Sequence, residues 1–189
     1  MNSEAPNKID FAPLDDANIH SQSDINSLLI IVSLKQNLQP IRKTYFDLAK
    51  KINEGCLCVG YLKGNTFSIT QPYLPDIGNP CFFCTIDRIQ HYEKQAHSTN
   101  PWSRMLLFCS EHKIDLPSPP ITALQRALIL GLISDRINLY TGHKIQQCFQ
   151  DNALTSTSIN LSSGEITEDI YPHWPMCECM RISHAKHPA

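Results

Sequence analysis

The chain has 189 residues, of which 42% are hydrophobic and 18% are charged, the composition of an ordinary globular protein with one core. Its 16 basic and 18 acidic side chains give a formal charge of −2 with both signs scattered, which excludes the basic field that nucleic acid binding requires. The longest apolar runs, at 28–32 and 127–133, are too short to span a bilayer.

We expect one domain with loose ends. Residues 1–24 are polar, contain Pro6 and Pro13 and show no apolar period, which predicts a flexible N-terminal segment. The domain is predicted to span residues 25–181, and residues 182–189 are predicted to form a flexible tail.

The first predicted elements are a strand, a helix and a second strand. The run LLIIVS at 28–33 is continuously apolar, which is typical of a strand buried on both faces. A helix follows Pro40, ends at Gly55 and carries one apolar stripe, formed by Ile41, Tyr45, Leu48 and Ile52. Residues 56–62 are predicted to be the second strand. A helix between two strands favours a parallel, right-handed βαβ unit and therefore an α/β sheet.

The middle of the chain leads into a pair of cysteines. A third strand is predicted at 66–70, and a proline-rich connection at 71–80 follows it. The residues after Cys84 have helical apolar spacing, so Cys81 and Cys84 are expected at a helix entrance, where amide N–H groups stabilise thiolate charge.

The second half is predicted to contain two helices and a hairpin. The helices are expected at 102–114 and 121–140, and the hairpin strands at 155–161 and 165–171. The helix at 121–140 is apolar on more than one face, so it is expected to be either deeply buried or shared with a partner, and exposed apolar surface at 127–137 is the expected partner face.

Two short cysteine clips dominate the candidate chemistry. Cys81-Phe-Phe-Cys84 and Cys177-Glu-Cys179 could together supply four thiolates to one Zn²⁺, in a closed, structural site. Eight cysteines without a signal peptide indicate a reducing cytoplasm, where clustered thiols hold metal more often than they form disulfides. Spacing alone leaves two alternatives open, a redox dithiol at the first clip or four unrelated buried thiols.

Other chemistry receives less support from the residues. The seven glycines form no phosphate-binding loop, so we expect no ATP chemistry and no catalysis by this chain alone. Cys109 and His112 could form a nucleophile and its base, but they are interpreted as a core cysteine and a surface histidine. Cys56 and Cys58 could form a rival metal clip, but they are interpreted as buried thiols. His173 precedes the second clip and is expected either to orient a thiolate or to be exposed to solvent. The pairs Arg42-Lys43 and Lys50-Lys51 are interpreted as a solvated helix face.

Four segments together resemble a known family. They are YLPDIGNPCFFCTIDR at 73–88, WSRML at 102–106, YTG at 140–142 before His143, and YPHWPMCECM at 171–180. In this order they resemble the zinc-containing B subunit of microcin synthetases, which install thiazole and oxazole rings in ribosomally made peptides.

The resemblance implies a fold, a metal site and partners. The family fold is an E1-like, Rossmann-like sheet with a tetrathiolate zinc, and its ligands correspond to Cys81, Cys84, Cys177 and Cys179. The B subunit is a scaffold that grips the leader of the precursor peptide and activates a YcaO-type, ATP-dependent cyclodehydratase. A flavin-dependent dehydrogenase then oxidises the azolines. By resemblance, the chemistry belongs to those partners.

The chain departs from the family pattern at its front. Family members carry a winged-helix leader-binding module and the first half of the sheet, for which 189 residues leave no room. We therefore expect a truncated E1-like domain that pairs with a longer copy or with another B-type subunit. The alternative function is a zinc-stabilised adaptor, or a regulatory partner of an E1-like enzyme outside azole synthesis.

Overall fold

The computed structural model describes residues 10, 12–13, 27–35, 38, 40–53, 55–95, 101–112, 114, 116, 120–141 and 155–186. Its elements in chain order are β1 (Leu28–Ser33), α2 (Pro40–Ala49), β2 (Cys56–Lys63), β3 (Thr66–Ile69), α3 (Phe82–Gln95), α4 (Pro101–Glu111), α5 (Ala123–Thr141), β4 (Thr155–Asn160), β5 (Ile166–Ile170) and α7 (Cys179–Lys186). The segment predicted to be flexible, 1–24, lies almost wholly outside the described residues. No helix among the described residues is both long and apolar enough to cross a bilayer.

The strands form one mixed sheet in the order β1-β2-β3-β4-β5. β1 and β2 are parallel and joined through α2, which confirms the predicted βαβ unit. The remaining neighbours are antiparallel, and β4 with β5 confirms the predicted hairpin. The turn between β2 and β3 contains Gly64 at φ 60°, a left-handed conformation that glycine adopts without a steric penalty.

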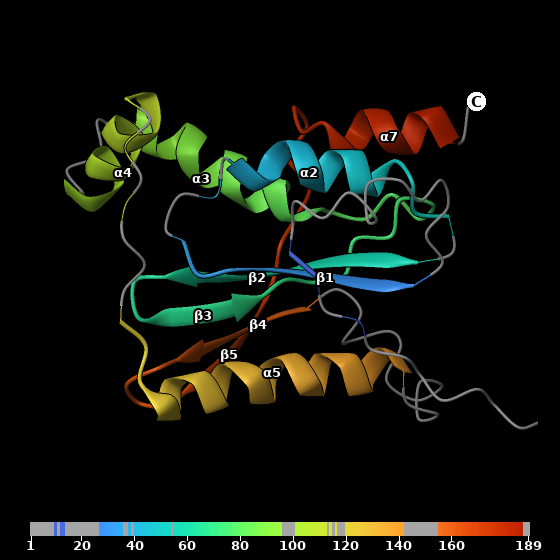
Figure 1. The fold of residues 1–189 in the computed structure, drawn as a ribbon. Coiled ribbons are helices and arrows are strands. Elements are labelled where there is room, and N and C mark those ends of the chain that lie inside the picture. The colour runs from blue at the N-terminus through green and yellow to red at the C-terminus, as the bar shows by residue number, and fades with distance from the viewer. Residues whose placement is uncertain are drawn as a thin grey trace, which may run out of the picture.

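One face of the sheet supports the first core. Leu57, Val59 and Tyr61 alternate along β2 and pack with apolar residues of α2, α3 and α7. Figure 1 shows these three helices together on one side of the sheet. The four cysteines of the two clips are buried within the same cluster, so this face positions the candidate site.

The opposite face is covered by α5, as Figure 1 also shows. Cys58, Leu62, Phe67, Ile69 and Ile159 of the sheet pack with Ile129 and Leu132 of the helix. The prediction that 127–137 offers exposed apolar surface is therefore largely wrong, because its main apolar side chains form this second core. Leu130 is the exception, with 61% of its surface exposed.

Both edges of the sheet and the last helix depart from expectation. β1 lies at an edge, and Val32 is 46% exposed, so the strand is not buried on both faces. All five residues of β5 are exposed at the other edge. The predicted boundary at 181 falls inside α7, whose Ile182 is buried in the first core and gives this helix an apolar anchor.

Candidate metal centre

The two cysteine clips meet at the ends of α3 and α7. Cys81 immediately precedes α3 and Cys84 lies in its first turn, while Cys177 precedes α7 and Cys179 begins it. Each clip is closed by a backbone turn: Cys84 N–H donates to the carbonyl of Cys81 at 3.1 Å, and Met180 N–H donates to that of Cys177 at 3.2 Å. The predicted helix entrance for the first clip is confirmed.

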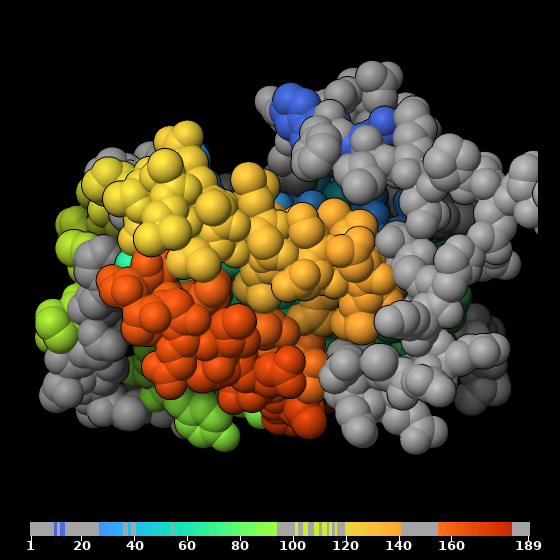
Figure 2. Space-filling view, turned by 90° about the horizontal axis from the view of Figure 1, so that it is seen from below, coloured from blue at the N-terminus to red at the C-terminus, as the bar shows by residue number. Residues whose placement is uncertain are grey.

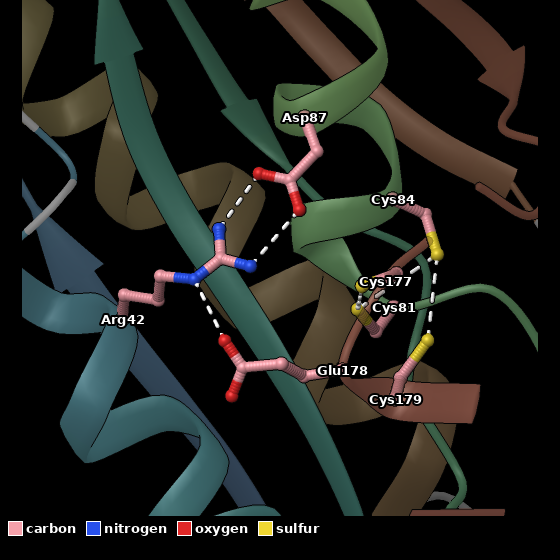
Figure 3. Close-up of polar contacts among 7 residues, drawn as sticks. All are labelled: Arg42, Cys81, Cys84, Asp87, Cys177, Glu178 and Cys179. Atoms are coloured by element: carbon pink, nitrogen blue, oxygen red, sulfur yellow. Dashed lines mark hydrogen bonds and ion pairs between the residues drawn. The ribbon is translucent and has the colours of Figure 1, made fainter. Parts of the chain in front are cut away.

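The four sulfur atoms form one compact group. All lie within 4.8 Å of one another. The Sγ atoms of Cys81 and Cys177 are 3.5 Å apart, and those of Cys84 and Cys179 are also 3.5 Å apart. A tetrahedron with Zn–S bonds of about 2.3 Å has S–S edges of about 3.8 Å. The spacing therefore fits a single metal ion, and Figure 3 shows the sulfurs converging from both segments.

Crowding gives the four thiols unequal acidities. Burial raises the pKa of Cys81, and the hydrogen bond with Cys179 raises that of Cys177. Hydrogen bonding with Cys177 lowers the pKa of both Cys84 and Cys179. Four buried sulfurs cannot all carry negative charge without a cation, whereas a divalent ion would compensate that charge. The donor set is the one expected for a soft or borderline metal.

Aromatic side chains surround the cluster on its sheet side. Tyr45, Tyr73 and Phe83 are fully buried beside it. The Tyr73 hydroxyl donates to the carbonyl of Cys179 at 3.4 Å, and Phe82 N–H donates to the Tyr45 hydroxyl at 3.4 Å. These contacts fix the backbone of both clips, and each of the four cysteines is 2% exposed or less.

Arg42 connects α2 to both clips. Its guanidinium donates to the two carboxylate oxygens of Asp87 in α3 at 2.7 and 3.0 Å, and its Nε donates to Glu178 at 3.1 Å. Figure 3 shows this bridge, in which Glu178 stands between the two cysteines of the second clip. The guanidinium also lies 4.7 Å from the ring centroid of Phe83. The interpretation of Arg42 as part of a solvated helix face is therefore wrong.

His173 and Arg88 hold the segment that leads to the second clip. His173 Nδ1 lies 3.9 Å from Cys84 Sγ, consistent with the predicted orienting role. Arg88 donates to the carbonyl oxygens of Pro172, at 3.0 Å, and of His173. Sequence reasoning missed Arg88, because the partners of its guanidinium are backbone groups 84 and 85 positions away.

The other cysteines lie apart from this group. Cys56 and Cys58 share the sheet face that α5 covers, and burial raises the pKa of Cys56 to about 11. Cys109 is 5% exposed, as expected for a core cysteine, and His112 is exposed, as expected, where it stacks on Phe108 and bonds to its carbonyl. Cys148 lies outside the described residues. Within the described ranges, the two clips form the one group of metal-ligand side chains that could hold an ion.

The fold and the site together define a class of protein: a mixed α/β domain whose five-stranded sheet carries a buried four-cysteine cluster. Residues 1–181 match the family described as "Microcin B17-processing protein McbB", and the chain belongs to that family. This finding confirms the resemblance drawn from the four sequence segments.

Individual relatives agree with the family assignment. The chain is 30% identical over 122 residues to the microcin B17-processing protein McbB of Escherichia coli, covering 64% of this chain and 41% of the relative. Its fold is similar to a chain of the E. coli microcin synthetase McbBCD complex, with a TM-score of 0.65 and 22% identity over 80% of this chain and 52% of that one. It is also similar to a chain of the same complex with pro-MccB17 bound, with a TM-score of 0.66 and 24% identity over 89% of this chain and 59% of that one. The chain thus spans about half the length of these relatives.

Proposed function

We propose that this chain is a non-catalytic scaffold subunit of a synthetase that installs thiazole and oxazole rings in a ribosomally made precursor peptide. Two findings support the assignment: membership of the family, and a fold similar to that of a chain in a microcin synthetase complex with pro-MccB17 bound. The proposed partners are a YcaO-type cyclodehydratase, a flavin-dependent dehydrogenase, the precursor peptide and another B-type subunit. The fold proposed for the chain is an E1-like domain.

The metal proposed for the four cysteines is Zn²⁺. The observation that carries this proposal is the approach of Cys81 to Cys177 and of Cys84 to Cys179, each at 3.5 Å between segments more than 90 positions apart. Four thiolates complete a tetrahedral shell, so the ion would have no open position for substrate. It would instead fasten α7 and the end of the hairpin to α3, which is a structural task.

A scaffold role also suits the way the site is embedded. Cys81, Cys84, Cys177 and Cys179 are each 2% exposed or less, so a substrate could not reach the metal without unfolding the surrounding aromatic cluster. A catalytic zinc keeps one exchangeable ligand and a route for substrate. The ring-forming chemistry is therefore assigned to the partner enzymes.

The metal proposal is tested by cysteine replacement. Cys81→Ser and Cys177→Ser should each reduce bound zinc in the purified chain from about one equivalent to less than about a tenth, because a tetrahedral thiolate site tolerates no missing ligand. Cys56→Ser and Cys109→Ser are matched controls, since both residues lie outside the cluster. Metal content is measured by plasma mass spectrometry. Equal loss in all four variants would refute the ligand assignment.

The assembly proposal is tested by co-purification. The tagged chain, expressed together with the proteins encoded beside its gene, should retain a YcaO-type cyclodehydratase through size-exclusion chromatography. Azole formation is then followed as the mass lost from the precursor peptide on ring closure and oxidation. Retained zinc with no cyclodehydratase recovered would instead favour an adaptor outside azole synthesis. ATP turnover by the chain alone would contradict the non-catalytic role.

A further inference from the structure

The outer edge of β5 is a structural feature that the metal site does not use. β5 forms an antiparallel ladder with β4 and ends the described sheet. All five of its residues are exposed, including Ile166 at 58% and Ile170 at 68%. Figure 2 shows this strand, in orange-red, lying open beside α5. A strand that exposes two isoleucines and whose outer backbone groups have no partner among the described residues is a template for another strand.

Antiparallel pairing specifies which backbone groups point outward. Asn160 N–H donates to the carbonyl of Glu165 at 2.9 Å at the start of the ladder. Every second residue of β5 after Glu165 therefore forms its backbone hydrogen bonds with β4, and these residues are Thr167 and Asp169. The N–H and C=O groups of Ile166, Glu168 and Ile170 therefore point away from β4. An added strand would bond to these three residues.

Side chains at the edge indicate the chemistry of such a strand. Ile166, Glu168 and Ile170 are in register with Ile159, Thr157 and Thr155, so they share the sheet face that α5 covers. Asp169 points to the opposite face, and Glu165 lies in the preceding turn. These three acidic side chains take part in no ion pair within the described ranges. The edge therefore presents negative charge between two exposed isoleucines.

Charge disfavours a second copy of β5 as the natural occupant. In the register that pairs all three outward residues, two β5 strands related by a two-fold axis would place Glu168 opposite Glu168, and like charges directly opposite each other are destabilising. A strand with a basic residue at that position, flanked on the same face by β-branched residues, would form opposite-charge and apolar pairs instead. We propose that the free edge of β5 binds an extended, basic segment of a partner protein by strand addition.

The register defines a probe for this proposal. In antiparallel pairing, the peptide acetyl-TVKKTVT-amide places its two valines opposite Ile170 and Ile166 and its central lysine opposite Glu168. Binding of a fluorescein-labelled form to the full chain is measured by fluorescence anisotropy. We expect saturable binding that weakens with added salt, and the peptide with glutamate in place of both lysines should bind at least about tenfold more weakly.

Backbone methylation separates strand addition from nonspecific charge attraction. N-methylation of the central lysine removes an N–H that faces β5 and should weaken binding at least about fivefold, whereas N-methylation of the preceding lysine removes one that faces away. The protein pair Glu168→Pro and Glu168→Gln makes the same distinction, since only proline removes an outward N–H while both remove the charge. Thermal unfolding confirms that each variant is folded.

Three results would overturn the proposal. Equal affinities for the two methylated peptides would show that no ladder forms. Slow hydrogen exchange at Ile166, Glu168 and Ile170 in the monomeric free chain would show that another part of the chain already covers the edge. Sedimentation showing a dimer that Glu168→Pro dissociates would make a second copy the occupant. None of these outcomes bears on zinc binding or on co-purification of the cyclodehydratase.

Discussion

Replacement of Arg42 by methionine tests whether this residue holds the two cysteine clips together. Methionine keeps an unbranched apolar stem and removes the guanidinium, which bonds to Asp87 and Glu178 and lies over Phe83. Because the guanidinium bonds both to α3 and to Glu178 of the second clip, its loss should destabilise the site face of the sheet. The sheet face covered by α5 should be unaffected.

The expected magnitude follows from the three contacts. The two-bond contact with Asp87 is partly buried, at 24% and 17% side-chain exposure, and hydrogen bonds to charged groups of this kind contribute about 1.5–3 kcal/mol. The ring contact adds about 0.5–1 kcal/mol. The ion pair with Glu178, whose side chain is half exposed, adds less than about 1 kcal/mol. Because these contributions overlap, we expect Arg42→Met to lower the free energy of unfolding by about 2–3 kcal/mol.

The assay is urea unfolding of the zinc-loaded chain followed by circular dichroism. A double-mutant cycle with Asp87→Asn should give a coupling energy of at least about 1 kcal/mol, since the two residues share the bidentate contact. Lys43→Met is the matched control: it removes a neighbouring charge of the same helix and should change the free energy of unfolding by less than about 0.5 kcal/mol. A loss below about 0.5 kcal/mol in Arg42→Met, or no coupling to Asp87, would refute the bridging role.

Two further predictions concern the other sheet face. Burial raises the pKa of the Cys56 thiol to about 11, so iodoacetamide should modify it at pH 8 about 100-fold more slowly than a thiol of pKa 9.0, with a midpoint near pH 11. Because the pKa of this thiol is higher in the folded chain than in the unfolded chain, the folded chain holds its proton more tightly. The resulting stabilisation is complete below pH 9 and is lost as the pH rises through 11. A midpoint near 9, with Cys56→Ser as the blank, would contradict the burial. Gly60→Ala should cost about 1–3 kcal/mol in thermal unfolding, because the new Cβ would lie 2.8 Å from the Phe67 ring. Gly131→Ala meets nothing within 4 Å on an exposed helix position and should stabilise by up to about 1 kcal/mol; destabilisation by both changes would show that the close contact is not the cause.

Local patterns predicted the elements well. The continuous run at 28–33 and the helical stripe after Pro40 specified a βαβ unit, because hydrophobic period and turn residues act over a few positions. The Pro-Cys-Phe-Phe-Cys segment likewise predicted a clip at a helix entrance. The family resemblance was needed to predict that both clips share one site. The spacing within each clip does not predict how the chain folds over the 92 residues between Cys84 and Cys177.

Long-range polar contacts could not be predicted in the same way. Arg42 and Arg88 lie on helices where charged side chains usually face solvent, and their partners are set by how distant segments pack. For the apolar residues at 127–137 the prediction was wrong in the opposite direction, because they were expected to be exposed and most of the large ones are packed in the second core. Their spacing showed that the helix must bury a wide face, and it did not reveal that the sheet of the same chain would cover it.

The two faces of the sheet differ in the contacts that they make. On one face, both clips, Arg42 and Arg88 join segments that are distant in the sequence. On the same side, Tyr171 N–H donates to the side-chain oxygen of Gln71 at 3.4 Å, where β5 leads into the second clip. On the other, α5 leaves the edge of β5 open. Because Cys177 follows the last residue of β5 by only seven positions, a metal at the clips would restrain the C-terminal end of the same strand that we propose as a docking edge. Metal binding and strand addition are therefore expected to support each other, since an anchored β5 loses less conformational entropy when a partner strand is added.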